Sequence, residues 1–120
     1  MDSIYIVGQH GPEVAERCYG PFVTATTAQA QEVKCKIFLM MDGVELAKDG
    51  MAEKVQAPGF PPLPDLINMF LESGGELELC SNSVEFRGIS EEDLRDDRIT
   101  IAGAATMVDD ILNYDRTLYF

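Results

Sequence analysis

The residue whose type and position most favour chemical reactivity is Cys80. It lies where a stretch of alternating polar and apolar residues is followed by small polar residues. The stretch Glu76-Leu77-Glu78-Leu79 has the period of a strand, and Ser81-Asn82-Ser83 can begin a helix. A cysteine at such a junction faces the positive end of the helix dipole and free backbone N–H groups, which favour the thiolate. We therefore predict that Cys80 is a reactive, partly solvent-reachable thiol and the catalytic residue. The alternative is a small buried hydrophobic residue at the end of a strand.

Side chains close to Cys80 in the sequence suggest how a sulfur anion would be stabilised. Ser81, Asn82 and Ser83 offer backbone and side-chain donors, and Arg87 follows one helical turn later. The single histidine, His10, follows the first predicted strand and is a candidate proton carrier. A histidine in a loop is more commonly a polar surface residue, so this assignment has a structural alternative.

Two further cysteines, Cys18 and Cys35, are widely spaced from Cys80. An odd number of cysteines without signs of secretion does not indicate a disulfide framework. With no CxxC motif and one histidine, we expect no metal site. Cys35 begins an apolar strand, which favours a place in the core. Cys18 follows the first strand, where packing or surface exposure is the main expectation and a resolving thiol is the alternative.

Strand and helix patterns alternate along the chain. Apolar or alternating segments predict five strands, over residues 3–7, 34–41, 76–80, 98–102 and 117–120. The clearest helix opens at Pro64 with an apolar stripe, and others are expected from Gly20-Pro21 and after Gly103. The proline-rich segment 57–64 is expected to be a loop. The pattern predicts a single α/β domain over residues 1–120, three-layered (α/β/α), with a mostly parallel sheet.

The topology also predicts where reactive groups lie, because ligands and reactive side chains gather at the carboxyl ends of parallel strands. These ends are residues 8–10, 41–43, 80–83 and 102–104. Both His10 and Cys80 are therefore expected at the same edge of the sheet.

Several segments together resemble the DsrE/DsrF-like family of small sulfur-relay proteins. The run from Glu78 to Ile89, ELCSNSVEFRGI, is similar to the family's cysteine segment, and FLMMDGV, from Phe38 to Val44, is similar to its second strand and following turn. The proline-rich crossing, Gly74-Gly75 before the cysteine strand, and Gly103-Ala104-Ala105 also fit. The resemblance covers nearly the whole chain, and its motifs are specific in combination.

This resemblance implies an α/β fold and a cysteine, matching Cys80, that accepts and passes on persulfide sulfur. It thus implies a sulfur carrier or sulfurtransferase subunit that exchanges sulfur with donor and acceptor proteins. It also implies a homo-oligomer, such as a trimer or hexamer, and the apolar end Leu118-Tyr119-Phe120 favours self-association. Persulfide transfer needs a thiolate but no metal or organic cofactor, so we expect none.

Charge and hydropathy narrow the partners. The formal net charge of −12, from 9 basic and 21 acidic residues, argues against binding to nucleic acid or to an anionic membrane. No apolar run approaches the roughly 18 residues that a membrane span needs. The start of the sequence has neither a basic segment nor a cleavage site, so we expect no export signal and a cytoplasmic location.

Two other functions fit the same pattern. The first is a non-catalytic assembly or regulatory subunit, in which Cys80 is merely packed. The second is a flavodoxin-like domain that binds a small ligand at the strand ends. No phosphate-binding glycine motif follows the first strand, which disfavours the second alternative.

Overall fold

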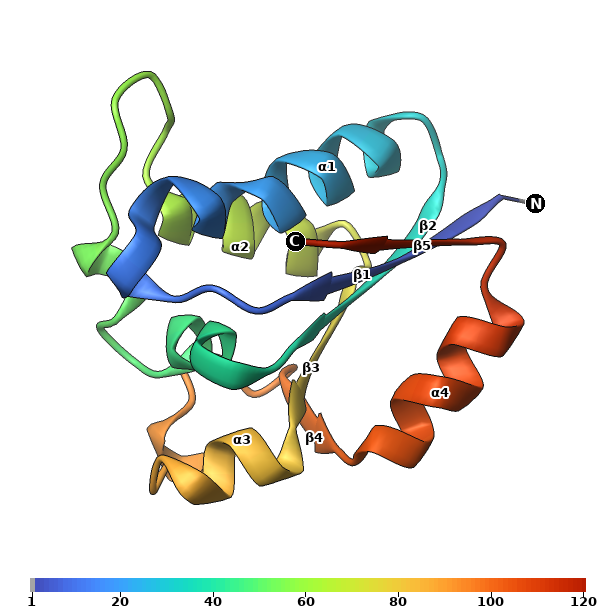
Figure 1. Cartoon of the computed structure of the whole chain (residues 1–120). Coiled ribbons are helices and arrows are strands. Elements are labelled where there is room, and N and C mark those ends of the chain that lie inside the picture. The colour runs from blue at the N-terminus through green and yellow to red at the C-terminus, as the bar shows by residue number, and fades with distance from the viewer. Residues whose placement is uncertain (1) are drawn as a thin grey trace.

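A computed structural model describes residues 2–120 of the chain. Its central element is a parallel β-sheet. Within this range five strands have the order β4-β3-β2-β1-β5, and each neighbouring pair is parallel (Figure 1). They are β1 (Ser3–Gly8), β2 (Lys34–Leu39), β3 (Glu76–Cys80), β4 (Thr100–Ala102) and β5 (Arg116–Tyr119). The predicted α/β class and mostly parallel sheet are confirmed.

Helices lie on both faces of this sheet, as the strand–helix alternation predicted. The α-helices are α1 (Tyr19–Ala30), α2 (Leu63–Glu72), α3 (Ser81–Phe86) and α4 (Ala104–Asn113). The helices α1 and α2 cover one face and α4 covers the other, whereas α3 extends from the end of β3 (Figure 1). Short 3-10 helices complete the connections: η1 (Pro12–Cys18), η2 (Met41–Ala47), η3 (Ala52–Lys54) and η4 (Glu91–Asp93).

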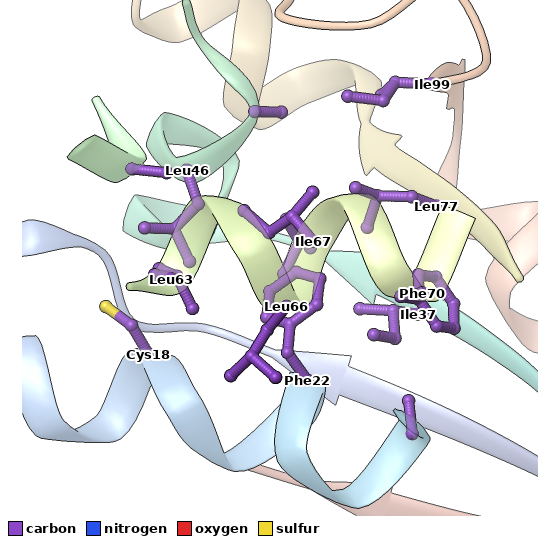
Figure 2. Packing of buried hydrophobic residues seen from close by; sticks show 14 of the residues in the cluster. Cys18, Phe22, Ile37, Leu46, Leu63, Leu66, Ile67, Phe70, Leu77 and Ile99 are labelled. Atoms are coloured by element: carbon purple, nitrogen blue, oxygen red, sulfur yellow. The ribbon is translucent and has the colours of Figure 1, made fainter. Parts of the chain in front are cut away.

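The main core lies between the sheet and the α1/α2 pair. The apolar stripe of α2 is buried as its spacing predicted, through Leu63, Leu66, Ile67, Phe70 and Leu71. Figure 2 shows four of these α2 side chains, Leu63, Leu66, Ile67 and Phe70, within a buried cluster that also contains Phe22 of α1 and Ile37 of β2. Gly75 allows the close fit, since a Cβ there would stand 2.3 Å from the Phe70 ring. The long apolar contact fixes the sheet's register and hence the place where β3 ends.

Some boundaries differ from the predicted ones for local reasons. The helix α1 begins at Tyr19 rather than at Gly20, because Pro21 still falls in the first turn, where no backbone donor is required. The strand β4 begins at Thr100 rather than Arg98, since Asp96 accepts hydrogen bonds from the backbone and side chain of Arg98 and holds it in a turn. The second strand ends at Leu39, and Met41 has a positive φ of 53°.

No helix among residues 2–120 combines the length and apolarity needed to cross a membrane.

Candidate functional site

The candidate site is built around Cys80, which is the last residue of β3 and the N-cap of α3. Its φ of −67° and ψ of 121° are extended, and the helix begins at the next residue. The predicted strand-to-helix junction is therefore confirmed. The residue also lies at the carboxyl edge of the sheet, paired with Ala102 of β4.

The direction of the Cys80 side chain follows from strand alternation. Residues two apart on a strand share a face, so Cys80 lies on the same side of the sheet as Glu78. This is the α4 side, where Cys80 belongs to a small apolar cluster with Tyr5, Val7 and Phe38. The thiol thus lies on the face opposite the large core.

The expectation that Cys80 is partly solvent-reachable is wrong for this conformation, because only 8% of the residue is exposed. Two residues of α4, Met107 and Ile111, pack against the cluster that contains Cys80. Met40, beyond the end of β2, packs there as well. The apolar cluster that contains Cys80 is therefore covered partly by α4 and partly by the segment after β2.

The three polar residues after Cys80 have separate environments. The hydroxyl of Ser83 is buried and accepts a hydrogen bond of 2.9 Å from the backbone N–H of Met41. Asn82 is exposed, and Ser81 is partly exposed. The N-cap residue of α3 is Cys80 itself, and its side chain makes no capping hydrogen bond. The part of these three polar residues in stabilising a sulfur anion stays a prediction.

Arg87 joins α3 to the segment that follows β2. Its guanidinium lies 2.6 Å from a carboxylate oxygen of Asp42 and donates a second hydrogen bond, of 3.2 Å, to the carbonyl of Ser83. These contacts hold the two strand-end segments together beside Cys80. An anion-stabilising role for Arg87 stays a prediction, and its side chain is engaged elsewhere in this conformation.

His10 follows β1 at the same edge of the sheet, and it is partly exposed. The strand β2 lies between β1 and β3, so His10 is two strand positions away from Cys80. Two such positions correspond to roughly 10 Å between backbones. The proton-carrier role proposed for His10 stays a prediction that needs a bridging group or a movement.

The other two cysteines lie in the core on the opposite face. Cys35 is buried in β2 among the residues that pack under α1, as predicted. Cys18 ends η1, and its thiol donates to the carbonyl of Gly11 at 3.0 Å. Burial, with a smaller effect from the charge of Glu13, raises the pKa of Cys18 to about 12, and burial also raises the pKa of Cys35. Packing, rather than thiolate chemistry, accounts for both residues.

A buried charge cluster under α4 was not anticipated from the sequence. The ammonium of Lys36 lies 2.7 Å from Asp110 of α4, 3.3 Å from Glu78 and 3.7 Å from Glu76. Burial by itself lowers the pKa of Lys36, but the hydrogen bond with Asp110 and the charge of Glu78 outweigh burial and raise it. The available signal was polar alternation at the start of two neighbouring strands, Lys34-Cys35-Lys36 and Glu76-Leu77-Glu78.

The hydroxyl of Tyr5 adds a second polar feature to this face. Tyr5 is fully buried, and among the described residues its hydroxyl finds no hydrogen-bond partner. Its ring lies 5.4 Å from that of Tyr114, just after α4. Burial, together with the charges of Asp110 and Glu78, raises the pKa of Tyr5.

Among residues 2–120, no three or more His, Cys, Asp or Glu side chains are grouped so as to hold a metal ion.

Comparison with known families places the whole described chain in one family. Residues 2–120 match the DsrE/DsrF-like family. The chain belongs to that family. The match extends through the β3–α3 junction and through α4, so both Cys80 and α4 belong to the region that matches the family.

The chain has relatives in Methanocaldococcus jannaschii and Methanopyrus kandleri. It is 40% identical over 114 residues to the uncharacterized protein MJ0760 of Methanocaldococcus jannaschii, a match that covers 95% of this chain but 40% of that protein. It is 31% identical over 121 residues to the uncharacterized protein MK0008 of Methanopyrus kandleri, which it covers to 95%. The chain thus spans well under half of MJ0760 and nearly all of MK0008.

Solved structures share the fold of this DsrE/DsrF-like chain. The YchN protein of E. coli superposes with a TM-score of 0.84 at 25% identity, and each chain is covered completely. MTH1491 of Methanobacterium thermoautotrophicum, a protein of unknown function, gives 0.74 at 11% identity over 98% of this chain and 97% of its own. The second likeness concerns the fold alone.

Proposed function

We propose that this DsrE/DsrF-like protein is a sulfur carrier, or a sulfurtransferase subunit, that accepts and passes on persulfide sulfur through Cys80. The observation that carries the proposal is the position of Cys80 at the carboxyl end of β3, where it is the N-cap of α3. The first backbone N–H groups of a helix have no partner within the helix and favour a nearby anion, although the Cys80 side chain makes no capping hydrogen bond to them in this conformation. Membership of the family supports the same assignment.

The other two cysteines strengthen the assignment by contrast. Cys18 and Cys35 lie in the main core, and burial raises the pKa of both. A thiol must ionise to attack a disulfide or persulfide, so these two are poorly placed for the reaction. Cys80 instead lies on the face that a single α-helix covers.

The proposed reaction is a pair of thiol–persulfide exchanges. The Cys80 thiolate attacks the outer sulfur of a donor persulfide and forms a new S–S bond. The donor's S–S bond breaks, and its electron pair leaves with the donor thiolate. An acceptor thiolate then attacks the outer sulfur on Cys80 and releases the Cys80 thiolate in the same way. No external oxidant or reductant is consumed, because the outer sulfur keeps its oxidation level through both exchanges.

Intact-mass measurement after incubation with inorganic polysulfide tests this function. We expect the wild-type protein to gain the mass of a sulfur atom, and Cys80→Ser to gain none while keeping its circular dichroism spectrum. Matched controls are Cys35→Ser and Cys18→Ser, which should load like the wild type. Loading that survives in Cys80→Ser but is lost in Cys18→Ser would identify Cys18 as the carrier. A wild-type protein that never loads would favour an assembly or regulatory subunit.

We also propose that the protein is a homo-oligomer. Large apolar side chains are exposed on several elements, including Phe86 of α3, which is 87% exposed, and Leu112 of α4. Met41 after β2 and Tyr119 of the edge strand β5 are exposed too. Covering such residues with a second copy removes apolar surface from water. Light scattering at micromolar concentration should give a mass above that of one chain, and a single-chain mass would contradict the proposal.

A further inference from the structure

The helix α4 packs only partly against the apolar cluster that contains Cys80. None of its ten residues is fully buried, whereas five of the ten residues of α2 are. On the Cys80 side of the sheet, the α4 residues that pack are Met107 and Ile111, each partly buried. Because local opening is easiest where little apolar surface is buried, α4 should separate from the sheet far more readily than α2.

One ion pair attaches the middle of α4 to the sheet. Asp110 accepts a hydrogen bond of 2.7 Å from Lys36, whose side chain is only 8% exposed. This contact joins the helix to β2 near the centre of the sheet. Among residues 2–120, it is the only ion pair between α4 and a strand of the sheet.

The C-terminal end of α4 is fastened as well. Just beyond it, Tyr114 lies against the ring of Tyr5, and the ammonium of Lys34 stands 5.2 Å from the Tyr114 ring centre. The carboxylate of Asp115 accepts hydrogen bonds from the backbone N–H and the hydroxyl of Ser3, at 2.9 and 3.1 Å. The end of the helix is therefore tied to the start of β1.

The N-terminal end of α4 has no comparable attachment among the described residues. Ala104, Ala105 and Thr106 are exposed, and Gly103 joins them to β4. Because Ala102 pairs with Cys80, this loosely held end begins beside the thiol. Figure 1 shows α4 running from the end of β4 back along the face of the sheet. Lifting its first turns would uncover Cys80 while the far end stayed in place.

We propose that α4 is a lid over Cys80, held shut by the contact between Asp110 and Lys36, and that it opens about its C-terminal attachment to admit a thiol or persulfide reactant. The identity of the reactant rests on the proposed function. The lid itself rests on the contacts of α4. A buried carrier thiol requires such a movement, because each exchange brings a second sulfur atom into contact with the first.

Two features of the α4 face make opening of the lid feasible. Lys36 also lies within 3.3 Å of Glu78 and 3.7 Å of Glu76, so it keeps a carboxylate partner after Asp110 leaves. Closure, in contrast, leaves the Tyr5 hydroxyl buried without a hydrogen-bond partner among the described residues. Opening gives that hydroxyl access to water. The closed state is thus held mainly by Asp110 and a small apolar contact.

The test measures how fast Cys80 reacts with iodoacetamide at neutral pH in the folded protein, with the modified cysteine identified by peptide mass. Asp110→Asn removes the charge that faces Lys36 and should speed the labelling of Cys80 by about tenfold, since a hydrogen bond between charged groups is weakened. The matched control is Asp109→Asn, the same change one residue away at an exposed position. It should leave the rate within about twofold of wild type. Equal rates in the two variants would overturn the proposal.

Hydrogen exchange of the wild-type protein provides a test that needs no variant. Backbone amides of α4 should exchange well before those of β1 and β2, and they should become still less protected in Asp110→Asn. Protection of α4 equal to that of β2 would overturn the lid even if Asp110→Asn failed to fold. Sulfur loading remains a separate readout. Faster labelling in a protein that never loads sulfur would support the lid and contradict the carrier, whereas loading with equal labelling rates would do the reverse.

Discussion

The two faces of the sheet are built on different principles. On the α1/α2 face, apolar side chains of both helices and of the strands form one large core. On the α4 face, the buried apolar cluster consists of Tyr5, Val7, Phe38 and Cys80, and Lys36 and Glu78 are buried beside it. The first face is stabilised by burial of apolar surface, and the second depends on a few charges and on a helix without a fully buried residue.

This difference matters because the candidate catalytic thiol is on the weaker face. A large core tolerates little movement, since close packing leaves no room for a helix to shift without losing many contacts. A small cluster fastened by one ion pair can open at much lower free energy. The proposed lid therefore pairs a rigid face that fixes the sheet with a face that opens to admit a reactant.

Removing a core aromatic residue from the stable face should have the largest effect. Phe70 is fully buried and packs edge-on against Phe22, with ring centres 6.1 Å apart. Phe70→Ala should lower the free energy of unfolding by about 4 kcal/mol in a urea titration, through lost burial and a residual cavity. Met69→Ala is the matched control, because Met69 is 52% exposed on the same helix, and its effect should stay below about 0.5 kcal/mol. Equal effects would show that α2 does not anchor the main core.

The stable face is also the part that the sequence predicted best. The spacing from Leu63 to Leu71 gave the buried stripe of α2, and the continuous apolar run in 37–39 gave a strand covered on both faces. These predictions succeed because apolar periodicity reports directly on burial. The same argument identified the strand that ends at Cys80.

The α4 face could not be predicted to the same degree. The pattern Glu76-Leu77-Glu78-Leu79 suggests a solvated outer face, yet Glu78 is buried against Lys36. Which carboxylate meets which ammonium depends on strand order, and the sequence left that order open. The exposure of Cys80 was mispredicted for a related reason, since it depends on how α4 lies across the sheet.

Removing the central charge of the α4 face should have the second-largest effect. Lys36→Met leaves Glu78 buried without its cation and Asp110 without its partner. An unpaired buried charge is expensive, so the free energy of unfolding should fall by about 3 kcal/mol. Lys34→Met is the control at an exposed position of the same strand and face, with an expected loss below about 1 kcal/mol. If Lys36→Met were as stable as the wild type, the buried charges would make no net contribution to the free energy of unfolding.

Alkaline pH should weaken the α4 face through Tyr114. Burial, followed by the charge of Glu76, raises the pKa of Tyr114 to about 12, above its ordinary value of 10.0. A raised pKa means that the unfolded chain loses this proton first, so the contribution of Tyr114 is complete below pH 10 and is lost as the pH rises from about 10 to 12. Tyr114→Phe should reduce that loss of stability by on the order of 1–2 kcal/mol, after allowance for solvent screening.

Urea titrations at pH 9 and pH 11.5 check this prediction. Tyr119→Phe serves as the control, because Tyr119 lies on the same face with a half-exposed ring, and it should lose stability as the wild type does. If Tyr114→Phe and wild type lost stability in parallel, the alkaline transition would have to originate elsewhere, with Cys18 on the opposite face as the next group to test.

The smallest effect concerns the hydroxyl of Tyr5, and its expected sign is opposite to the others. Since this hydroxyl is buried without a partner among the described residues, Tyr5→Phe removes a desolvated polar group and keeps the ring contacts with Phe38 and Tyr114. The free energy of unfolding should rise by about 1 kcal/mol.

The control for Tyr5→Phe is Tyr19→Phe on the α1 face. The Tyr19 hydroxyl is not among the buried polar atoms that lack a hydrogen-bond partner, so its removal should give no gain in stability. Tyr5→Phe should also slow the labelling of Cys80. The closed lid would then no longer bury a hydroxyl that lacks a hydrogen-bond partner, so the closed state would be favoured. A destabilised Tyr5→Phe protein would mean that the hydroxyl is hydrogen-bonded in solution, and the contrast between the two faces would then rest on Lys36 and its carboxylates alone.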